Sequence, residues 1–231
     1  MTRKLFWTKP YRAICEAGVV SVDGARITLD QTVFFAQSGG QESDHGSIGG
    51  HVVHVAEQDG DDIVYTLPDD HGLQPGDMVH VEIDWVRRYR LMRLHFAAEL
   101  VLELVGRALP GIEKIAAHIA ADKARIDFLH EQNVAGLFPR IESAVQAIVA
   151  ANLPINSAFS DEAAGRRYWA IEGLAQVPCG GTHLLRTKEV GAIVLKRRNV
   201  GSGKERIEIL LAGSAAASTE VPDPPLTWPT L

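Results

Sequence analysis

The chain has 231 residues, of which 46% are hydrophobic and 23% are charged, and its formal net charge is −6. These values predict a globular protein with one large domain or two modest ones, and the acidic balance gives no global sign of nucleic-acid binding. The two cysteines, Cys15 and Cys179, exclude a disulfide framework and favour a reducing compartment. Because the N-terminus lacks a secretory signal, and no stretch approaches the roughly 18 apolar residues of a membrane span, we expect a cytoplasmic protein without a membrane segment.

The first third of the chain has the pattern of short β-strands. Residues 19–22 and 25–29 are β-rich runs joined across Asp23-Gly24, a dipeptide that suits hairpin turns. Residues 51–55 and 63–67 look like a second pair, and a further strand is expected at 78–83. Closely spaced strands of this kind predict a small antiparallel barrel domain over residues 1–84.

A glycine-rich segment interrupts these strands at residues 34–50. It can be a simple connection, or a loop whose bare backbone, at Gly39 and Gly40, approaches a ligand closely. In the second case Gln41 would offer its side-chain amide to that ligand. Composition favours the simple connection by about two to one.

A long helix is predicted over residues 85–106, with Asp84 as its N-cap and an apolar stripe at helical spacing. His95 and Glu99 are four residues apart, so their side chains stack on one face. Because the neighbouring positions are mostly apolar, a cation would satisfy both groups. This spacing is one that zinc uses when a helix supplies two ligands.

The segment Cys179-Gly180-Gly181-Thr182-His183 offers a thiol and an imidazole that a tight glycine turn can bring together. Zinc requires four ligands, and the helix pair supplies the other two. The sequence therefore predicts a zinc site made of His95, Glu99, Cys179 and His183.

Two strands separated by a turn at Asp122-Lys123 are expected within residues 113–128, further strands at 166–171, 190–195 and 206–211, and a helix within 132–152. A proline-rich tail is expected over 214–231. Basic residues cluster at the start of the long helix and late in the chain. They form either a phosphate-binding surface or solvated faces, and the candidates are Arg87, Arg88, Lys196, Arg197, Arg198 and Lys204.

Five motifs occur in the order found in the free-standing alanyl-tRNA editing proteins called AlaX, and the chain resembles this family from about residue 11 to 211. The glycine-rich segment with Gly39, Gly40 and Gln41 is similar to the family's N-terminal motif, and His95 with position 99 is similar to its HxxxH metal motif. The other three motifs are residues 117–128, the Cys179–His183 segment, and a closing strand pair near the C-terminus.

The resemblance implies a medium-length, zinc-dependent hydrolase that removes serine or glycine from mischarged alanine tRNA and contacts the acceptor end of that tRNA. It also implies an α+β fold, in which the barrel precedes an editing domain (85–213) with a mixed sheet and long helices. Gln41 and Thr182 would assist catalysis, and Gly39 and Gly40 would hold the aminoacyl end.

The chain departs from the family pattern at two positions. Glu99 replaces the second histidine of HxxxH and would be a zinc ligand or a general base, with the ligand role favoured about two to one. Phe96 replaces a small hydroxyl residue at a position expected to contact the substrate. Two other functions therefore remain open: a tRNA- or metal-binding module with impaired catalysis, and a zinc hydrolase of small esters.

Overall fold

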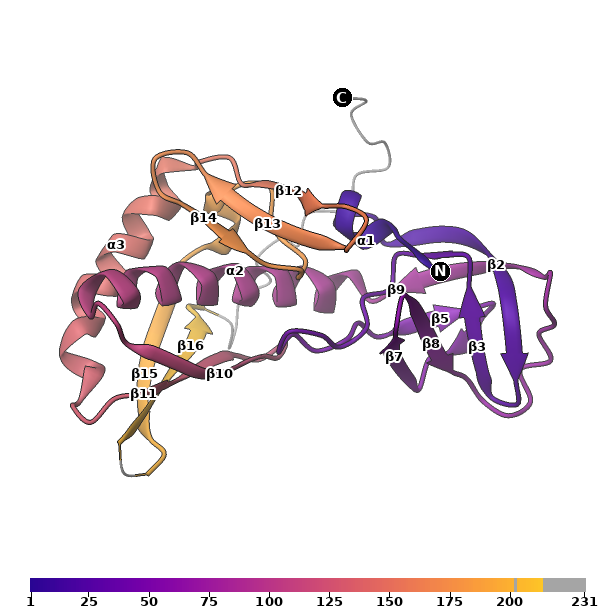
Figure 1. Ribbon diagram of the computed structural model, residues 1–231, viewed down its shortest axis with the longest axis horizontal. Helices are drawn as coiled ribbons and strands as arrows, with labels where there is room; N and C mark the ends of the chain where they lie inside the picture. Colours follow the sequence, from indigo (N-terminus) through magenta and orange to yellow (C-terminus); the bar gives the residue numbers. More distant parts are fainter. Residues whose placement is uncertain (202, 214–231) are drawn as a thin grey trace. The chain divides into compact units, whose positions relative to one another are not determined.

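The computed structural model describes residues 1–201 and 203–213, and it confirms the α+β fold class (Figure 1). The described chain forms two compact units. The first comprises Met1–Ser38 and Glu42–Tyr89, and the second comprises Gly39–Gln41 and the residues from Arg90 onward. The units therefore divide inside the long helix. The tail expected at 214–231 lies outside the described residues.

The first unit is a curled antiparallel sheet of seven strands in the order β6-β5-β9-β2-β3-β8-β7, which forms a half-barrel. Its core contains buried aromatic and aliphatic side chains such as Phe34, Phe35 and Tyr65. The strands are β2 (Ile14–Asp23), β3 (Arg26–Leu29), β5 (Gly46–Ile48), β6 (His51–Val52), β7 (Val55–Asp59), β8 (Asp62–Thr66) and β9 (Met78–Ile83). Short β1 (Arg3–Lys4) pairs in parallel with β4 (Gln31–Thr32), and α1 covers Leu5–Thr8.

The hairpin expected across Asp23-Gly24 is confirmed, because β2 pairs with β3 and Gly24 has a positive φ of 56°. The second expected pair was only partly right. The run 51–55 is divided: β6 turns back onto β5 through Gly49-Gly50, and the strand that pairs with β8 is β7, which begins at Val55.

The second unit holds two antiparallel sheets around α2 (Trp85–Ala108). Figure 1 shows α2 running between a three-stranded sheet and a four-stranded sheet, and residues such as Leu94, Leu100 and Val101 on it are fully buried. The first sheet has the order β12 (Asn156–Asp161), β13 (Arg166–Ile171), β14 (Ala175–Pro178). The second has the order β10 (Glu113–Ile119), β11 (Ala124–Leu129), β16 (Lys204–Leu211), β15 (Ile193–Asn199).

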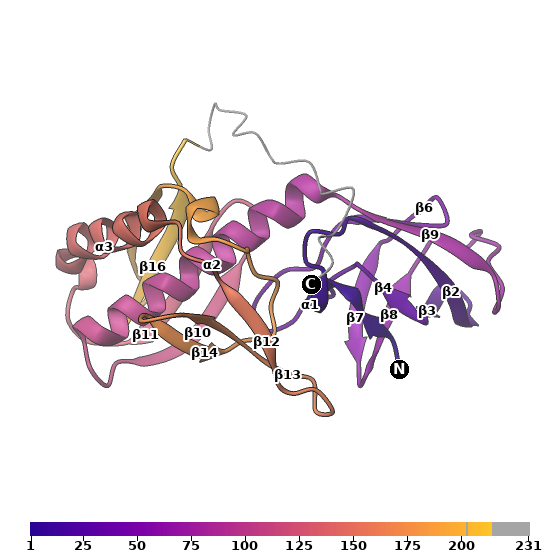
Figure 2. The same ribbon diagram turned by 90° about the horizontal axis from the view of Figure 1, so that it is seen from above.

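The mixed sheet expected for this unit is not found among the described strands, because short connections such as the β10–β11 and β15–β16 turns make antiparallel neighbours. Among the described residues of this unit, parallel pairing is confined to an isolated bridge between Gln41 and Ile119. Figure 2 shows the same elements from above, and α3 (Phe138–Ala151) contacts β15. The short 3₁₀ helices η1 (Val134–Leu137) and η2 (Thr187–Val190) complete the unit.

The segment Val134–Ala151, formed by η1 and α3, is long and apolar enough by composition to cross a membrane, contrary to the expectation from the sequence. Its charged residues are few, and many of its side chains are small and apolar. In this fold α3 buries one stripe of side chains, made of Phe138, Ile141, Val145 and Val149. This is the spacing of a helix that covers a core.

Three carboxylates on β11 and β16 have pKa values below their ordinary range because cations bind them. The cations are Arg206 for Asp127, Arg197 for Glu205, and Lys123 for Glu208. A carboxyl group with a lowered pKa in the folded state stabilises the fold fully at pH values above its unfolded-state pKa, which is 3.8 for aspartate and 4.5 for glutamate. This stabilisation is lost as the pH falls through the lower pKa of the folded state.

We expect the urea concentration at the unfolding midpoint to decrease as the pH is lowered from about 5 to about 3. Glu208→Gln should lower this midpoint at pH 7 but change it little near pH 3. Exposed Glu172, replaced by glutamine, is the matched control. Parallel pH profiles for wild type and Glu208→Gln would contradict this explanation.

Candidate metal centre

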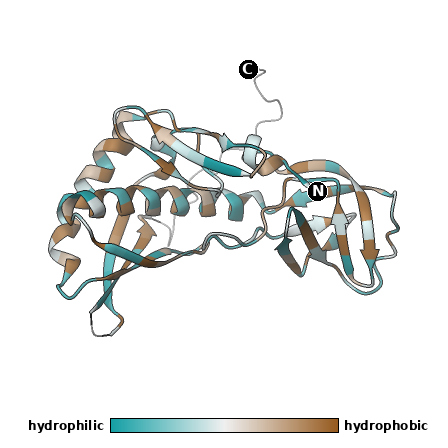
Figure 3. Ribbon diagram, in the orientation of Figure 1, coloured by the Kyte–Doolittle hydropathy of each residue, from teal (hydrophilic) through white to brown (hydrophobic). Residues whose placement is uncertain are grey.

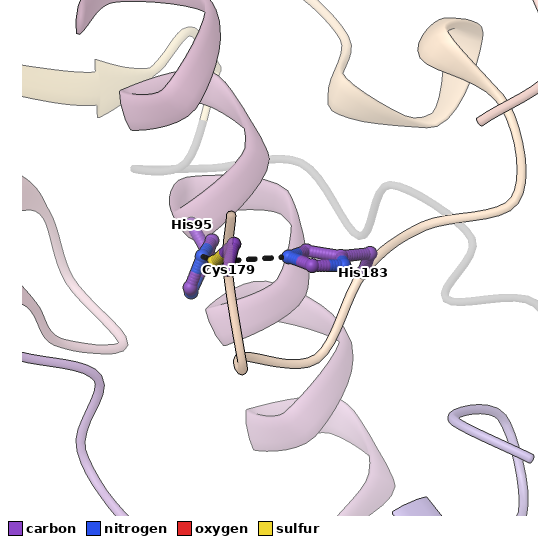
Figure 4. Close-up of side chains that lie close together, drawn as sticks. All are labelled: His95, Cys179 and His183. Carbon is purple, nitrogen blue, oxygen red and sulfur yellow. Dashed lines mark hydrogen bonds between the residues drawn. The ribbon is translucent and has the colours of Figure 1, made fainter. Parts of the chain in front are cut away.

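Three side chains from two segments converge in the second unit: His95 from α2, and Cys179 and His183 from the loop after β14 (Figure 4). The Cys179 Sγ lies 3.2 Å from His95 Nε2 and 3.3 Å from His183 Nε2. Both histidines are at least 95% buried, whereas Cys179 is partly exposed. The two halves of the predicted site are thus brought together.

Glu99 lies at the edge of this cluster, one helical turn from His95. Its Oε1 is 3.4 Å from His95 Nε2 and 3.5 Å from Cys179 Sγ, and its Oε2 accepts a 3.0 Å hydrogen bond from the Trp169 indole. The Glu99 carboxylate is therefore held with Oε1 toward His95 and Cys179 and with Oε2 toward Trp169.

Hydrogen bonds fix the orientation of both imidazoles. The Gln41 Oε1 accepts from His95 Nδ1 at 2.7 Å and from the Thr182 backbone N–H at 3.3 Å, while Gln41 Nε2 donates to Thr182 Oγ1 at 2.9 Å. The Ser157 Oγ lies 2.9 Å from His183 Nδ1. With each Nδ1 engaged in this way, each Nε2 is directed at Cys179, and a ring nitrogen held in this direction can ligate a metal ion once it is deprotonated.

The glycine-rich loop places Gln41 against His95. Gly40 accepts a hydrogen bond from the Ile119 N–H at 2.8 Å, so the loop runs along β10. Gly40 has a φ of 88°, and a Cβ there would lie 2.5 Å from the Ala117 carbonyl oxygen. Only glycine fits this close approach, and Gln41 consequently becomes fully buried.

The buried charges act on one another strongly. Burial acts to lower the pKa of His95, but the negative charges of Cys179 and Glu99 outweigh burial and raise that pKa to about 10. Burial likewise opposes ionisation of Glu99, yet the contact with His95 lowers the pKa of this carboxyl to about 2. Burial lowers the pKa of His183 well below its ordinary value, aided by the charge of His95, which favours the neutral form that binds metals.

Three of the four predicted ligands, His95, Cys179 and His183, form a group that could hold a metal ion, with ligand atoms within 4.8 Å of one another, and Glu99 is not part of that group. Zinc with bonds of about 2.0–2.3 Å to four tetrahedral N, O and S donors places those donors about 3.3–3.6 Å apart. The two Sγ–Nε2 separations and the two distances from Glu99 Oε1, which together span 3.2–3.5 Å, are close to this range. The thiol also favours zinc over magnesium or calcium, which prefer oxygen ligands.

Comparison with known proteins places the chain in a family. The model of the threonyl and alanyl tRNA synthetase second additional domain matches residues 171–208, which include Cys179 and His183. Alanyl-tRNA editing protein AlaX-M of Pyrococcus horikoshii is 31% identical over 91% of this chain and 98% of its own length. The chain belongs to the AlaX family.

Two further relatives agree with this assignment. The AlaX-M protein of Methanosarcina barkeri is 31% identical over 91% of this chain and 99% of its own length. The alanine--tRNA ligase of Methanococcus aeolicus is 30% identical over 90% of this chain, although the match takes in 25% of the ligase's length. This AlaX chain thus spans nearly the whole of the free-standing relatives and about a quarter of the ligase.

Several residues that the sequence analysis assigned to substrate binding are buried in this AlaX chain. Phe96 is fully buried, and its ring centroid lies 5.1 Å from that of Trp169 and 6.1 Å from that of His183. Gln41, which holds His95, is also buried, as is Thr182, which was predicted to assist catalysis and is hydrogen-bonded to Gln41. Gly39 is exposed and Gly40 is partly exposed.

The candidate tRNA-binding cations differ in accessibility. Arg88 is fully buried in the first unit and is bound to Asp44, which removes it from contact with a ligand. Arg87 is 15% exposed and pairs with Glu42 at 2.7 Å. Arg197 binds the buried Glu205. The remaining candidates, Lys196, Arg198 and Lys204, are exposed.

Three residues that contact the cluster were missed from the sequence. Ser157 and Trp169 hold His183 and Glu99, and Arg167 is buried with its guanidinium 3.4 Å from the Gly181 carbonyl oxygen. These residues lie on β12 and β13, and the strand pattern alone gave no sign that they would reach a site built from α2 and the Cys179 loop.

Because Gln41 orients His95, we expect Gln41→Leu to lower zinc affinity about 10- to 100-fold, which is the usual cost of losing a group that holds a metal-bound histidine. Competition with a chelating dye, in the absence of any tRNA, measures this affinity. Exposed Gln132→Leu is the control. Unchanged zinc affinity in Gln41→Leu together with weaker substrate binding would instead favour direct contact of Gln41 with the substrate.

Proposed function

We propose that this chain hydrolyses the ester bond between a wrongly attached amino acid and the terminal adenosine of alanine tRNA, acting in the cytoplasm. Serine and glycine are the candidate amino acids. One water is consumed, and the products are the free amino acid and the free tRNA hydroxyl. The observation that supports this function is the zinc-compatible cluster of His95, Cys179 and His183 in a chain that matches 98% of an alanyl-tRNA editing protein.

Zinc, when bound, would supply Lewis acidity and, by expanding its coordination or exchanging a ligand, an acidified water. His95, Glu99, Cys179 and His183 would hold the ion. Gln41 and Ser157 fix the two imidazoles, so that ligand geometry is set before the substrate arrives. The exposed backbone at Gly39 and the adjoining Gly40 would hold the aminoacyl end.

The role of Glu99 is testable because its two candidate roles predict different results. As a ligand, Glu99→Gln should lower zinc affinity at least about 10-fold, and Glu99→His should retain zinc. As a general base, Glu99→Gln should keep zinc and lose on the order of 10²-fold or more in deacylation rate. We expect the ligand result, since Oε1 lies at ligand spacing from His95 and Cys179.

A groove of about 330 Å³ opens beside Glu99 and is a candidate path for the aminoacylated end. It lies between α2 and β14, and its lining comprises Glu99, Leu102, Glu103, Gly106, Arg107 and Val177. No atom lies within 4 Å of a Cβ added at Gly106, so a side chain there would extend into open space.

We expect Gly106→Phe to slow deacylation at least about 10-fold by narrowing this groove, without loss of thermal stability, because glycine is a poor helix former. Gly136→Phe is the control, since Gly136 is also exposed and its added Cβ meets no atom within 4 Å. Equal rates for Gly106→Phe and wild type would exclude the groove as the path.

The proposed function is tested by measuring the deacylation of seryl-, glycyl- and alanyl-tRNA(Ala) by the wild type and by Cys179→Ala. We expect rapid removal of serine or glycine by the wild type, with alanine retained. Uncatalysed rates for all three substrates in the wild type would contradict it.

The presence of glutamate at position 99 favours one second candidate, a module that binds tRNA or metal without turnover. That candidate predicts tight tRNA binding and a bound metal in the wild type, together with uncatalysed deacylation.

A further inference from the structure

The four-stranded sheet of the second unit has one apolar face and one charged face. Paired residues on neighbouring antiparallel strands point to the same side, and alternate residues along a strand point to opposite sides. Ile126 pairs with Ile207, and both are fully buried on the inner face. Arg125 and Glu208, Glu208 and Lys196, and Asp127 and Arg206 are paired on the outer face.

The outer face carries an excess of positive charge, although the whole chain has a net charge of −6. Lys123 belongs to this face through its 2.8 Å ion pair with Glu208. Counting Lys123, which lies in the turn between β10 and β11, the outer face holds six cationic and three acidic side chains. The cations are Lys123, Arg125, Lys196, Arg198, Lys204 and Arg206, and the acids are Glu113, Asp127 and Glu208.

Burial places the negative charge beneath the positive charge. The side chains of Asp127 and Glu208 are only 12% and 9% exposed, whereas that of Arg198 is 67% exposed. Arg206 binds Asp127 at 2.6 Å, and Lys123 and Arg198 both bind Glu208. The two buried acids hold cations in place from below, and the surface that solvent meets is basic. Figure 3 shows the hydrophilic residues along the hairpin end of β15.

The outward residues of these strands include one imidazole, that of His118, which is paired with Arg125, but no Phe, Tyr or Trp side chain. Proteins that read unpaired bases stack them on aromatic rings, and phosphates are bound by lysine and arginine. A basic face without Phe, Tyr or Trp rings suits the backbone of an RNA helix, whose deep major groove hides the bases.

We infer that the outer face of the β10-β11-β16-β15 sheet binds the phosphate backbone of the tRNA, independently of its nucleotide sequence. This inference rests on the proposed tRNA substrate. It assigns Arg125 and Arg206 to the contact surface with Lys196, Arg198 and Lys204. It excludes Arg197, which points to the inner face. Selection of alanine tRNA must then come from other contacts.

The test is a triple variant, Arg125→Gln, Lys196→Gln and Lys204→Gln, which leaves the ion pairs of Asp127 and Glu208 intact. The matched control removes three exposed cations of the same unit that lie off this sheet, by Arg140→Gln, Arg166→Gln and Lys188→Gln. Affinity for uncharged tRNA(Ala) and for a tRNA of another specificity is measured at several salt concentrations, with thermal unfolding as the check on folding.

We expect the face variant to weaken binding of both tRNAs equally, at least about 10-fold, and to reduce the magnitude of the salt slope by about 2 to 3. The control should bind like the wild type. Equal losses in the two triple variants, or a loss confined to tRNA(Ala), would overturn the inference. A face variant that kept the tRNA affinity of the wild type but no longer bound phosphatidylserine vesicles would also overturn the inference.

Deacylation by the same variants separates this inference from the proposed function. If wild type binds tRNA through the face but releases no amino acid, the proposed function fails and the inference stands. If wild type deacylates tRNA and the face variant binds and reacts like it, the inference fails alone.

Discussion

Replacing Cys179 by alanine is expected to lower bound zinc from about one equivalent per chain to near zero and to slow deacylation on the order of 10³-fold. The Cys179 Sγ lies in contact with both His95 Nε2 and His183 Nε2. Replacing Cys179 by alanine therefore removes the sulfur ligand that lies between the two imidazoles. What remains are two nitrogens and a carboxylate, and zinc sites favour four ligands. Elemental analysis of the purified protein and a single-turnover assay give the two values.

Cys15→Ala is the control for the loss of a thiol, because Cys15 is buried in the core of the first unit. It should leave zinc content and deacylation close to the wild-type values. A Cys179→Ala protein that retained one zinc and full activity would show that the cluster of His95, Cys179 and His183 is not the reactive centre.

A methyl group at Gly181 is expected to disable the site almost as completely, without removing any ligand. The added Cβ would lie 2.2 Å from His95 Cε1 and 2.8 Å from its Nδ1. The His95 ring is buried and bound to Gln41, so it has no room to move aside. We expect Gly181→Ala to lose zinc affinity at least about 100-fold, because overpacking displaces a ligand, and to cost about 1–3 kcal/mol of stability.

The neighbouring glycine provides a matched control. A Cβ at Gly180 meets no atom within 4 Å, so Gly180→Ala should keep the zinc affinity, stability and deacylation rate of the wild type. Equal zinc affinities for Gly180→Ala and Gly181→Ala would contradict the packing of His95 against Gly181.

The sequence was most informative where local spacing determines geometry. The i, i+4 spacing of His95 and Glu99 on α2 and the short Cys179–His183 loop predicted the segments that converge. The Asp23-Gly24 hairpin was predicted for the same reason, since both partners lie within a few residues. The divided run at 51–55 shows the limit, because its pairing depends on a Gly49-Gly50 turn that composition did not distinguish from an open loop.

Contacts between distant segments could not be predicted. The hydrogen bonds of Gln41 to His95 and of Ser157 to His183 join strands and loops far apart in the chain, so Gln41 was assigned to the substrate and Ser157 to no site. Full burial of Arg88 depends on its pairing with Asp44, 44 residues away. Basic residues that lie close together in the sequence give no indication of whether a given arginine is buried or exposed.

The measurement that tests the central claim most directly is zinc content and deacylation on one preparation, before chelation, after chelation and after zinc is added back. If His95, Glu99, Cys179 and His183 hold the ion on which ester hydrolysis depends, the purified chain carries about one zinc. The chain loses its activity on mischarged tRNA(Ala) when chelation removes the zinc, and it regains that activity when one equivalent of zinc is added back. Full deacylation by the metal-free chain would contradict the claim.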